Sequence, residues 1–494
     1  MQPFPVPPDE IPVGGDWQRG AGPTSACVDP ADGEVIATVH AADPAQVDAA
    51  ARAGAGAAVD PAWRDLLPHQ RAHMLDRVAD AIEHHAEQLA LLQTRNTGKT
   101  LGETRALVAS AAGTFRYYSA ALETLEGELP PSRGAHLTMS VHEPIGVVGA
   151  ITPWNSPIAS DAQKIAPALA AGNAVLLKPA EATPLVSLAL ARLAHDAGVP
   201  PALLSVLPGP GAVVGDAIAR HPLVGKLAFT GGTTTGRVLG RIAAERIIPV
   251  TMELGGKSPT IVCEDADVDE AVAGILYGIF SSTGQSCVAG SRIFLPRKRY
   301  EELAQRLVAG ATALRVGPGT DPATRIGPLA TFAHRDKVAA MVDRAREEGA
   351  RIRCGGTIPD EARLARGAFY PPTLLDGLAP DAKTCQEEIF GPVGVLLPYD
   401  DEDDLVTQAN ATVYGLACGI WTADYRRALR LARRIEAGTV WINTYKQFSI
   451  STPFSGVKDS GLGADKGRAA IRGYQRQKSL YLNLATEPIA WAGA

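Results

Sequence analysis

The sequence predicts an α/β protein of two or three domains. Its 494 residues exceed the length at which one hydrophobic core stops growing. Hydrophobic residues make up 46% of the chain and charged residues 20%, which is typical of a folded globular protein. From about residue 145, short apolar runs alternate with helix-like segments, and this alternation predicts parallel sheets covered by helices.

The first clear elements are two helices, at 72–93 and 104–122, where apolar residues recur every three or four positions. Strands and helices then alternate. Strands are predicted at 145–151, 174–178, 204–207 and 226–230, and helices at 158–171, 186–197 and 237–246. The segment from about 145 to 254 is therefore predicted to be a doubly wound unit.

The alternation restarts after Gly255 and Gly256, with a strand at 260–263, a helix at 268–280 and a strand at 291–295. This indicates a second α/β domain. Residues 125–142 and 475–484 alternate polar and apolar side chains but have too few neighbouring strands to bury a face. We expect them to pair with another part of the protein or with another subunit.

Charge, terminus and cysteine usage exclude several classes of protein. The formal net charge of −6 offers no basic surface for nucleic acid or an anionic membrane. Residues 1–10 lack the basic and apolar regions of a secretory signal, and no apolar run reaches the roughly 18 residues of a membrane span. The 6 cysteines form neither a disulfide framework nor a zinc pattern. We therefore expect a cytoplasmic protein without a structural metal, in which thiols are free to react.

Three glycine-rich segments are candidates for binding phosphate. Thr97-Gly-Lys-Thr100 resembles the end of a Walker loop, but Gln93 stands where that loop requires glycine, and a helix precedes it. In Gly209-Pro-Gly211 the following Gly215 comes one position late for a dinucleotide fingerprint, so a tight turn explains it equally well. Phe229-Thr-Gly-Gly-Thr-Thr-Thr-Gly236 is the best candidate, because it joins a strand to a helix start. An ordinary helix capped by threonine remains the alternative.

Three polar residues stand in apolar or tightly turning surroundings: Asn155, Glu253 and Cys287. Each has an ordinary explanation. An asparagine between prolines is often a turn residue, a glutamate beside two glycines is often a solvated strand end, and a single cysteine is often an inert core residue. Their functional interpretation rests on the motifs around them.

These motifs resemble the aldehyde dehydrogenase superfamily from about residue 60 to about residue 482. The matching segments are Glu143-Pro-Ile-Gly-Val-Val-Gly149, Pro153-Trp-Asn155, Lys178-Pro-Ala-Glu181, Phe229-Thr-Gly231, Glu253-Leu-Gly-Gly-Lys-Ser-Pro259, Gly284-Gln-Ser-Cys287, Glu388-Ile-Phe-Gly-Pro392 and Pro453-Phe-Ser-Gly-Val-Lys458. So many matches in the same order are highly specific.

The resemblance implies an aldehyde dehydrogenase-like α/β fold. It assigns 1–124 and 148–254 to a Rossmann-type NAD-binding domain, 255–459 to an α/β catalytic domain, and 125–147 with 471–494 to a small β oligomerisation element. It also implies a homodimer or homotetramer.

The resemblance makes Cys287 the nucleophile that attacks the aldehyde carbon, since hydride leaves only after that carbon becomes tetrahedral. Asn155 and the backbone N–H of Cys287 match the oxyanion site, and Glu253 matches the base that activates water to cleave the thioester. Lys164 joins this catalytic set by the same resemblance.

The resemblance also implies cofactor and substrate contacts. The cofactor residues are Ile151, Thr152, Pro153, Trp154, Lys178, Glu181, Gly211, Phe229, Gly231, Gly232, Thr235, Leu254, Glu388 and Phe390. Lys178 and Glu181 match the pair that holds the adenosine ribose. Because a carboxylate would repel a 2′-phosphate, Glu181 favours NAD over NADP. The substrate residues are Ser156, Gln163, Ser286, Tyr445 and Phe448.

The chain departs from the family pattern in several places. Gly232 replaces a usual serine, Ser282 an asparagine and Ser455 a glycine, and Ala464-Asp465 stands where arginine-glutamate is common. Ser156 and Gln163 replace aromatic residues, and Lys446 adds a charge, so we expect a polar, aromatic or acidic aldehyde. The alternatives are a relative that transfers the acyl group to coenzyme A, against which Glu253 argues, and a non-catalytic relative.

Overall fold

The computed structural model describes residues 4, 5 and 9–487. The prediction that residues 1–10 carry no secretory signal therefore falls mostly outside the described residues. So do the start of the predicted segment 1–124 and the end of the predicted segment 471–494. The strands are β1 (Glu10–Val13), β2 (Asp16–Arg19), β3 (Thr24–Val28), β4 (Val35–His40), β5 (His136–Pro144), β6 (Val147–Ile151), β7 (Ala174–Lys178), β8 (Leu204–Val206), β9 (Val224–Thr230), β10 (Val250–Glu253), β11 (Pro259–Val262), β12 (Arg292–Pro296), β13 (Arg351–Cys354), β14 (Thr373–Asp376), β15 (Val393–Tyr399), β16 (Tyr414–Gly415), β17 (Ala417–Trp421), β18 (Thr439–Ile442), β19 (Val457–Lys458), β20 (Gly461–Leu462) and β21 (Gln475–Asn483).

The helices are α1 (Pro44–Val59), α2 (Pro61–Arg64), α3 (Pro68–His84), α4 (Ala86–Thr97), α5 (Leu101–Leu122), α6 (Pro157–Ala170), α7 (Leu185–Asp196), α8 (Asp216–Arg220), α9 (Thr233–Arg246), α10 (Val268–Phe280), α11 (Tyr300–Thr312), α12 (Phe332–Glu347), α13 (Lys383–Gln386), α14 (Glu402–Asn410), α15 (Tyr425–Arg434) and α16 (Gly467–Arg472). The predicted α/β class is confirmed.

The first sheet has the strand order β20-β10-β9-β6-β7-β8, and every pairing in it is parallel except that of β20. The chain runs outward from β6 through β7 to β8, then returns to β9 and β10 on the other side. Strand order therefore reverses between β6 and β9. In open α/β sheets, ligands bind beyond the carboxyl ends of the strands at such a switch point.

The second sheet has the order β13-β14-β15-β12-β11-β17-β18 and is parallel except for β13. Buried apolar residues pack on both of its faces, in two clusters drawn from residues 261–445. A third cluster combines residues 4–254 with 470–474. These separate cores support the division into NAD-binding and catalytic domains, which we keep as a proposal.

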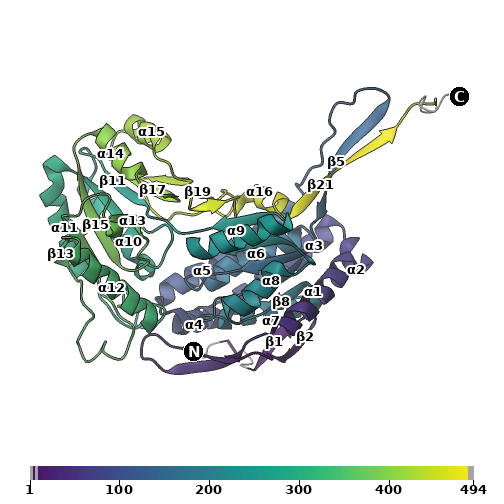
Figure 1. The fold of residues 1–494 in the computed structure, drawn as a ribbon, viewed down its shortest axis with the longest axis horizontal. Coiled ribbons are helices and arrows are strands. Elements are labelled where there is room, and N and C mark those ends of the chain that lie inside the picture. The colour runs from purple at the N-terminus through teal and green to yellow at the C-terminus, as the bar shows by residue number, and fades with distance from the viewer. Residues whose placement is uncertain (1–3, 6–8, 488–494) are drawn as a thin grey trace.

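An arm formed by β5 and β21 projects from the body of the molecule (Figure 1). The two strands pair antiparallel from His136↔Asn483 to Pro144↔Gln475. The two segments with alternating side chains therefore pair with each other. Leu480, Tyr481 and Leu482 of β21 are exposed, which leaves apolar surface uncovered on this arm.

The structure differs from the sequence-based elements in several places. The helix predicted at 72–93 is two helices, because the backbone of His85 leaves the helical region and its ring packs on Phe4. The helix predicted to begin at residue 237 begins at Thr233. The strands β1 to β4 and the helix α1 were not predicted.

Among the described residues, no helix is both long enough and apolar enough to cross a bilayer. The same residues contain no cluster of three or more histidine, cysteine, aspartate or glutamate side chains suited to a metal ion.

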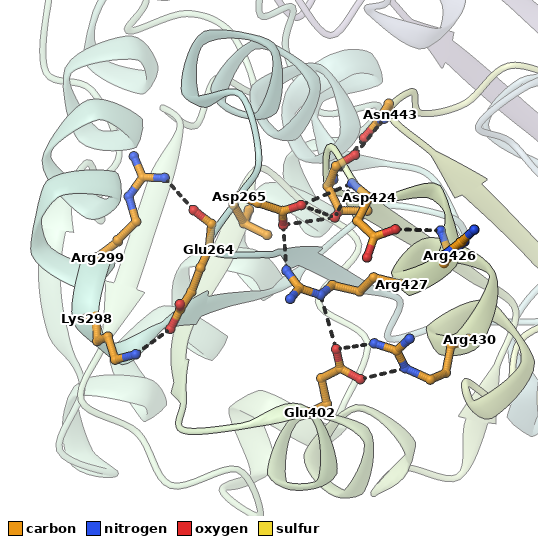
Figure 2. A network of polar contacts seen from close by, with 12 residues as sticks. Glu264, Asp265, Lys298, Arg299, Glu402, Asp424, Arg426, Arg427, Arg430 and Asn443 are labelled. Atoms are coloured by element: carbon orange, nitrogen blue, oxygen red, sulfur yellow. Dashed lines mark hydrogen bonds and ion pairs between the residues drawn. The ribbon is translucent and has the colours of Figure 1, made fainter.

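A network of charged side chains joins the end of β11 to α14 and α15 (Figure 2). Its centre is Asp265, which accepts hydrogen bonds from the Thr422 hydroxyl (2.9 Å) and from Nη1 of Arg427 (2.7 Å). Glu402 accepts a hydrogen bond from Nη2 of Arg430 at 2.8 Å and forms an ion pair with Nε of Arg427 at 3.2 Å. Burial alone would raise the pKa of Asp265, but these donors hold it below its usual range.

Replacing Asp265 by alanine should lower the free energy of unfolding by about 1–3 kcal/mol, because several donors lose a charged acceptor. Replacing Lys298 by alanine is the matched control. Its pair with Glu264 is mostly exposed to solvent, and removing such a pair changes stability by at most about 1 kcal/mol. Denaturant unfolding measures both, and equal effects would show that the network adds nothing beyond surface pairing.

Candidate functional site

Two connected cavities occupy the switch point of the first sheet. The larger, of about 820 Å³, lies over the carboxyl ends of β6, β7 and β9. The smaller, of about 240 Å³, reaches the segment that precedes β12. Both are lined by Pro153, Trp154, Thr230, Gly231, Gly232 and His334. The two cavities therefore form one continuous crevice, which runs from the carboxyl ends of the strands of the first sheet to the amino ends of the strands of the second.

Cys287, Asn155 and Glu253 all line the smaller cavity. They come from three elements: Asn155 follows β6, Glu253 ends β10, and Cys287 lies between α10 and β12. The fold brings together three residues that lie 34 to 132 positions apart in the chain.

The backbone before Cys287 is in an unusual conformation. Ser282, Thr283 and Gly284 have φ values of 59°, 55° and 69°. The left-handed region costs non-glycine residues roughly 1–2 kcal/mol each. The N–H of Ser282 donates to Oε1 of Glu103 at 2.5 Å, which helps to hold this segment. Local strain is therefore stored next to Cys287.

Gly256 allows the β10–β11 link to contact this segment. A Cβ at Gly256 would lie 2.4 Å from the carbonyl oxygen of Cys287, closer than the 3.0 Å below which a Cβ clashes with a nonbonded backbone atom. The absence of a side chain is what lets Glu253 and Cys287 share one cavity.

The Cys287 thiol is strongly biased toward its protonated form. Burial, followed by the charges of Glu388 and Glu253, raises its pKa to about 12, and Lys446 opposes this. A base must therefore take the proton before the sulfur becomes nucleophilic.

Glu253 is buried, and neither of its carboxylate oxygens has a hydrogen-bond partner within the described residues. Burial and the charge of Asp465 raise its pKa well above the usual value, against the effect of Lys164. Nζ of Lys164 lies 2.5 Å from Oδ2 of Asp465, and both side chains are buried. The shorter acid at 465 therefore still reaches Lys164, which does not itself line either cavity.

Asn155 is held over the Cys287 segment, because its Nδ2 donates to the carbonyl oxygen of Gln285 at 3.0 Å. One N–H of this amide is used by that bond, and the other is available to a ligand.

All fourteen predicted cofactor residues line one of the two cavities. Leu254, Glu388 and Phe390 line the smaller one, and the larger is lined by Ile151, Thr152, Pro153, Trp154, Lys178, Glu181, Gly211, Phe229, Gly231, Gly232 and Thr235. One oxygen of Glu181 accepts the N–H of Gly211 at 3.0 Å. Glu388 accepts the N–H of Gly256 at 3.0 Å, and burial raises its pKa to about 7.

The start of α9 has the form of an anion site. Gly232 is its N-cap, and no side chain caps the first turn, so the predicted alternative of a threonine cap is not observed. Thr234 and Thr235 of that turn line the larger cavity. The unpaired N–H groups and the helix dipole both favour a negative charge there.

The site contains residues that the sequence interpretation missed. His334 and Lys337 on α12 line the smaller cavity, and Thr331 lines the larger. The His334 ring packs edge-on against Trp154, with 5.0 Å between centroids, and its Nε2 lies 2.7 Å from the carbonyl oxygen of Phe390. Thr331 caps α12 and so marks the start of the helix, but no local pattern shows which face meets the crevice.

The predicted substrate residues are dispersed. Ser156 and Gln163 line neither cavity, and Ser286 lines a separate small one. Tyr445 is 2% exposed, packs 6.0 Å from Trp421 and belongs to the catalytic-domain core, so it offers no surface to the crevice. Phe448 is 48% exposed and packs against Phe454.

A sequence model of the aldehyde dehydrogenase family matches residues 17–480. The chain therefore belongs to the aldehyde dehydrogenase family, and it is an oxidoreductase that acts on aldehydes.

Individual relatives agree with this assignment. The chain is 39% identical over 465 residues to the putative aldehyde dehydrogenase DhaS of Bacillus subtilis (strain 168), covering 94% of this chain and 93% of the relative. It is similar to the NAD+ complex of aldehyde dehydrogenase from Bacillus cereus, with a TM-score of 0.94, 37% identity and 97% of each chain covered. It is also similar to betaine aldehyde dehydrogenase from Staphylococcus aureus in complex with NAD+, with a TM-score of 0.97, 33% identity, and 99% of this chain and 97% of that one covered.

Replacing Gly256 by alanine should lower aldehyde oxidation by roughly 100-fold, because the added Cβ displaces the Cys287 segment, and misplacing a reacting group by about 1 Å costs that much. The matched control is Gly102→Ala on α5, where a Cβ meets nothing within 4 Å. Steady-state rates and thermal unfolding compare the two. Full activity in Gly256→Ala would show that the close contact with Cys287 has no role.

Proposed function

We propose that the protein is an NAD-dependent aldehyde dehydrogenase that forms and then hydrolyses a thioester on Cys287. The observation that supports this most strongly is that Cys287, Asn155 and Glu253 line one cavity, which opens into the crevice at the switch point. A nucleophile, an amide donor and a base around one point are the set that aldehyde oxidation requires.

The crevice fits a dinucleotide by its own features. The uncapped start of α9 suits a pyrophosphate, and Glu181 and Lys178 line the same cavity farther along. When bound, NAD accepts the hydride from the substrate carbon. Glu181 has one oxygen free to accept a ribose hydroxyl, and its charge would repel a 2′-phosphate, so NAD is favoured over NADP.

In the first step the Cys287 sulfur attacks the aldehyde carbon. Because burial disfavours the thiolate, the nearby carboxylate of Glu253 is the group suited to take the thiol proton. The free N–H of Asn155 and the backbone N–H of Cys287 then stabilise the oxyanion. These donors are fixed beforehand, since Asn155 is bonded to Gln285.

In the second step Glu253 activates the water that cleaves the thioester. Its unpartnered, buried oxygens can accept a proton from water, and its raised pKa makes it a stronger base than an exposed glutamate. The Lys164–Asp465 pair borders this carboxylate and sets its local charge. We assign Lys164 this positioning role.

We further propose a cytoplasmic homodimer or homotetramer. The exposed apolar residues of β21 support association through the arm, because an isolated two-stranded ribbon is only marginally stable. The six cysteines are all free thiols, which is consistent with a reducing compartment. The substrate is a polar, aromatic or semialdehyde compound.

Replacing Cys287 by alanine should abolish NADH formation, because no other cysteine lines either of the two cavities. Cys354→Ala, which removes a half-buried thiol of β13, is the matched control and should retain most activity. Absorbance at the NADH band measures both variants. Substantial turnover by Cys287→Ala would refute the mechanism.

Replacing Glu253 by glutamine should slow thioester hydrolysis by about 100-fold or more and leave acyl-enzyme detectable by mass spectrometry. In the native enzyme, hydrolysis should become faster as pH rises above the range in which an exposed glutamate ionises, because the raised pKa delays formation of the carboxylate. The variant should lose that dependence. An unchanged steady-state rate would contradict the role of Glu253, and a requirement for coenzyme A would favour the acyl-transferring alternative.

A further inference from the structure

Three aromatic side chains stand where the two cavities of the crevice meet. Trp154 follows β6, His334 lies in the first turn of α12, and Phe390 lies between α13 and β15. All three line the smaller cavity, and Trp154 and His334 also line the larger one. We call Trp154, His334 and Phe390 the aromatic triad. His334 has no part in the chemistry proposed above.

The three rings pack against one another edge to face. The ring centroids of Trp154 and His334 are 5.0 Å apart, those of Trp154 and Phe390 5.2 Å, and those of His334 and Phe390 6.1 Å. The ring planes of these pairs meet at 62°, 85° and 65°. Contacts of this geometry are attractive beyond the apolar area that they bury, so the orientation of each ring depends on the other two.

The backbone of Phe390 is strained. Its φ is 59°, in the left-handed region that residues other than glycine rarely adopt. Such a residue persists only where the surrounding structure imposes the conformation. If that support were removed, the backbone would relax and the ring would leave its place in the smaller cavity.

His334 supports this conformation with a hydrogen bond. Its Nε2 lies 2.7 Å from the carbonyl oxygen of Phe390. A carbonyl oxygen can only accept, so Nε2 carries the proton and donates it. Burial lowers the pKa of His334, which this hydrogen bond opposes and Lys337 reinforces, so the ring is neutral. The single N–H donor of the ring is therefore used by Phe390.

The start of α12, which carries His334, is fixed to the segment that contains Cys287. The N–H of Ala330 donates to Oε1 of Gln285 at 2.9 Å. Oγ1 of Thr331 then accepts the N–H of His334 at 3.1 Å and caps the helix. His334 therefore holds Phe390 from a helix whose own position is defined relative to the nucleophile.

The residue after Phe390 is closely packed on two sides. A Cβ at Gly391 would lie 2.7 Å from Cγ2 of Val338 on α12. On the other side, a Cβ at Gly284 would clash with the carbonyl oxygen of Gly391. The loop that carries Phe390 therefore lies between α12 and the strained turn that precedes Cys287.

The smaller cavity is the place of hydride transfer, because it contains Cys287, on which the aldehyde carbon becomes tetrahedral. Hydride transfer requires the accepting ring of the dinucleotide in this cavity. The start of α9, which suits a pyrophosphate, borders the larger cavity. Of these two cavities Phe390 lines only the smaller, so its ring lies at the hydride-accepting end of the crevice.

We propose that His334 is a positioning residue, which holds the carbonyl group of Phe390 and so fixes the Phe390 ring against the nicotinamide end of the bound cofactor. Its N–H donor binds the protein, so His334 acts through Phe390. This inference rests on the proposed function, because it requires NAD in the crevice. It assigns a role to a residue that takes no part in the bond-making steps.

The test compares the binding of NAD with that of ADP by isothermal titration calorimetry without aldehyde. ADP has the adenosine and pyrophosphate but lacks the nicotinamide end, so the ratio of the two Kd values reports on that end. His334→Phe keeps an aromatic ring but loses the donor. It should weaken NAD binding about fivefold and leave ADP binding unchanged, because one hydrogen bond is lost. His334→Gln keeps an N–H donor of similar reach and should retain most of the NAD affinity.

A double-mutant cycle with Phe390→Ala separates positioning from direct contact. Phe390→Ala alone should weaken NAD binding. Adding His334→Phe should then have little further effect, because no ring is left to position. A full fivefold effect of His334→Phe in the Phe390→Ala background would mean that His334 contacts the dinucleotide itself, and the inference would be wrong.

His73→Gln changes an exposed histidine of α3 and should leave both Kd values unchanged. Thermal unfolding checks that each variant folds, and His334→Leu replaces His334→Phe if that variant does not. Unchanged NAD affinity in the folded His334 variant, or equal losses of NAD and ADP affinity, would overturn this inference and leave the proposed function intact. Failure of the native enzyme to bind NAD would reject the proposed function and this inference with it.

Discussion

The close contact between Gly256 and the carbonyl of Cys287 is the constraint on which the site depends. Glu253 ends a strand of the first sheet, and Cys287 lies in the segment before a strand of the second, so they meet only where elements of the two sheets approach each other. Any side chain at 256 would separate them. The strained turn at 282–284 and its hydrogen bond to Glu103 hold the segment that carries Cys287. The geometry of this cavity therefore depends on the contact between elements of the two sheets.

The electrostatics of the crevice follow from that burial. Cys287, Glu253 and Glu388 all have raised pKa values because water is excluded, and each carboxylate makes the thiolate less favourable. Two lysines oppose these increases in pKa: Lys446 lowers the pKa of Cys287, and Lys164 lowers that of Glu253. Burial therefore favours the protonated, uncharged forms of all three groups at the point where protons must move.

Local sequence patterns predicted the doubly wound sheet well, because its strands are apolar runs bounded by glycine and its helices have clear periodicity. They failed at His85, where a contact with Phe4 breaks the helix, and at the short strands β1 to β4, of which β2 and β3 are largely exposed and resemble loops. Motif resemblance led to Cys287, Glu253, Asn155 and the cofactor residues. It missed His334 and Lys337, because the side of α12 that meets the crevice depends on how the domains pack. Tyr445 shows the opposite error: it follows a strand in sequence but packs into the core against Trp421.

The short strand β20 has a consequence for biosynthesis. It adds the edge to the first sheet beside β10, and residues 470–474 complete the first core. Translation proceeds from the amino end, so the ribosome has made every strand of the second sheet before these pieces emerge. The first sheet begins earlier in the chain but is completed last. Until residues 461–474 are made, the nascent chain has an unpaired edge at β10, which exposes it to misassembly.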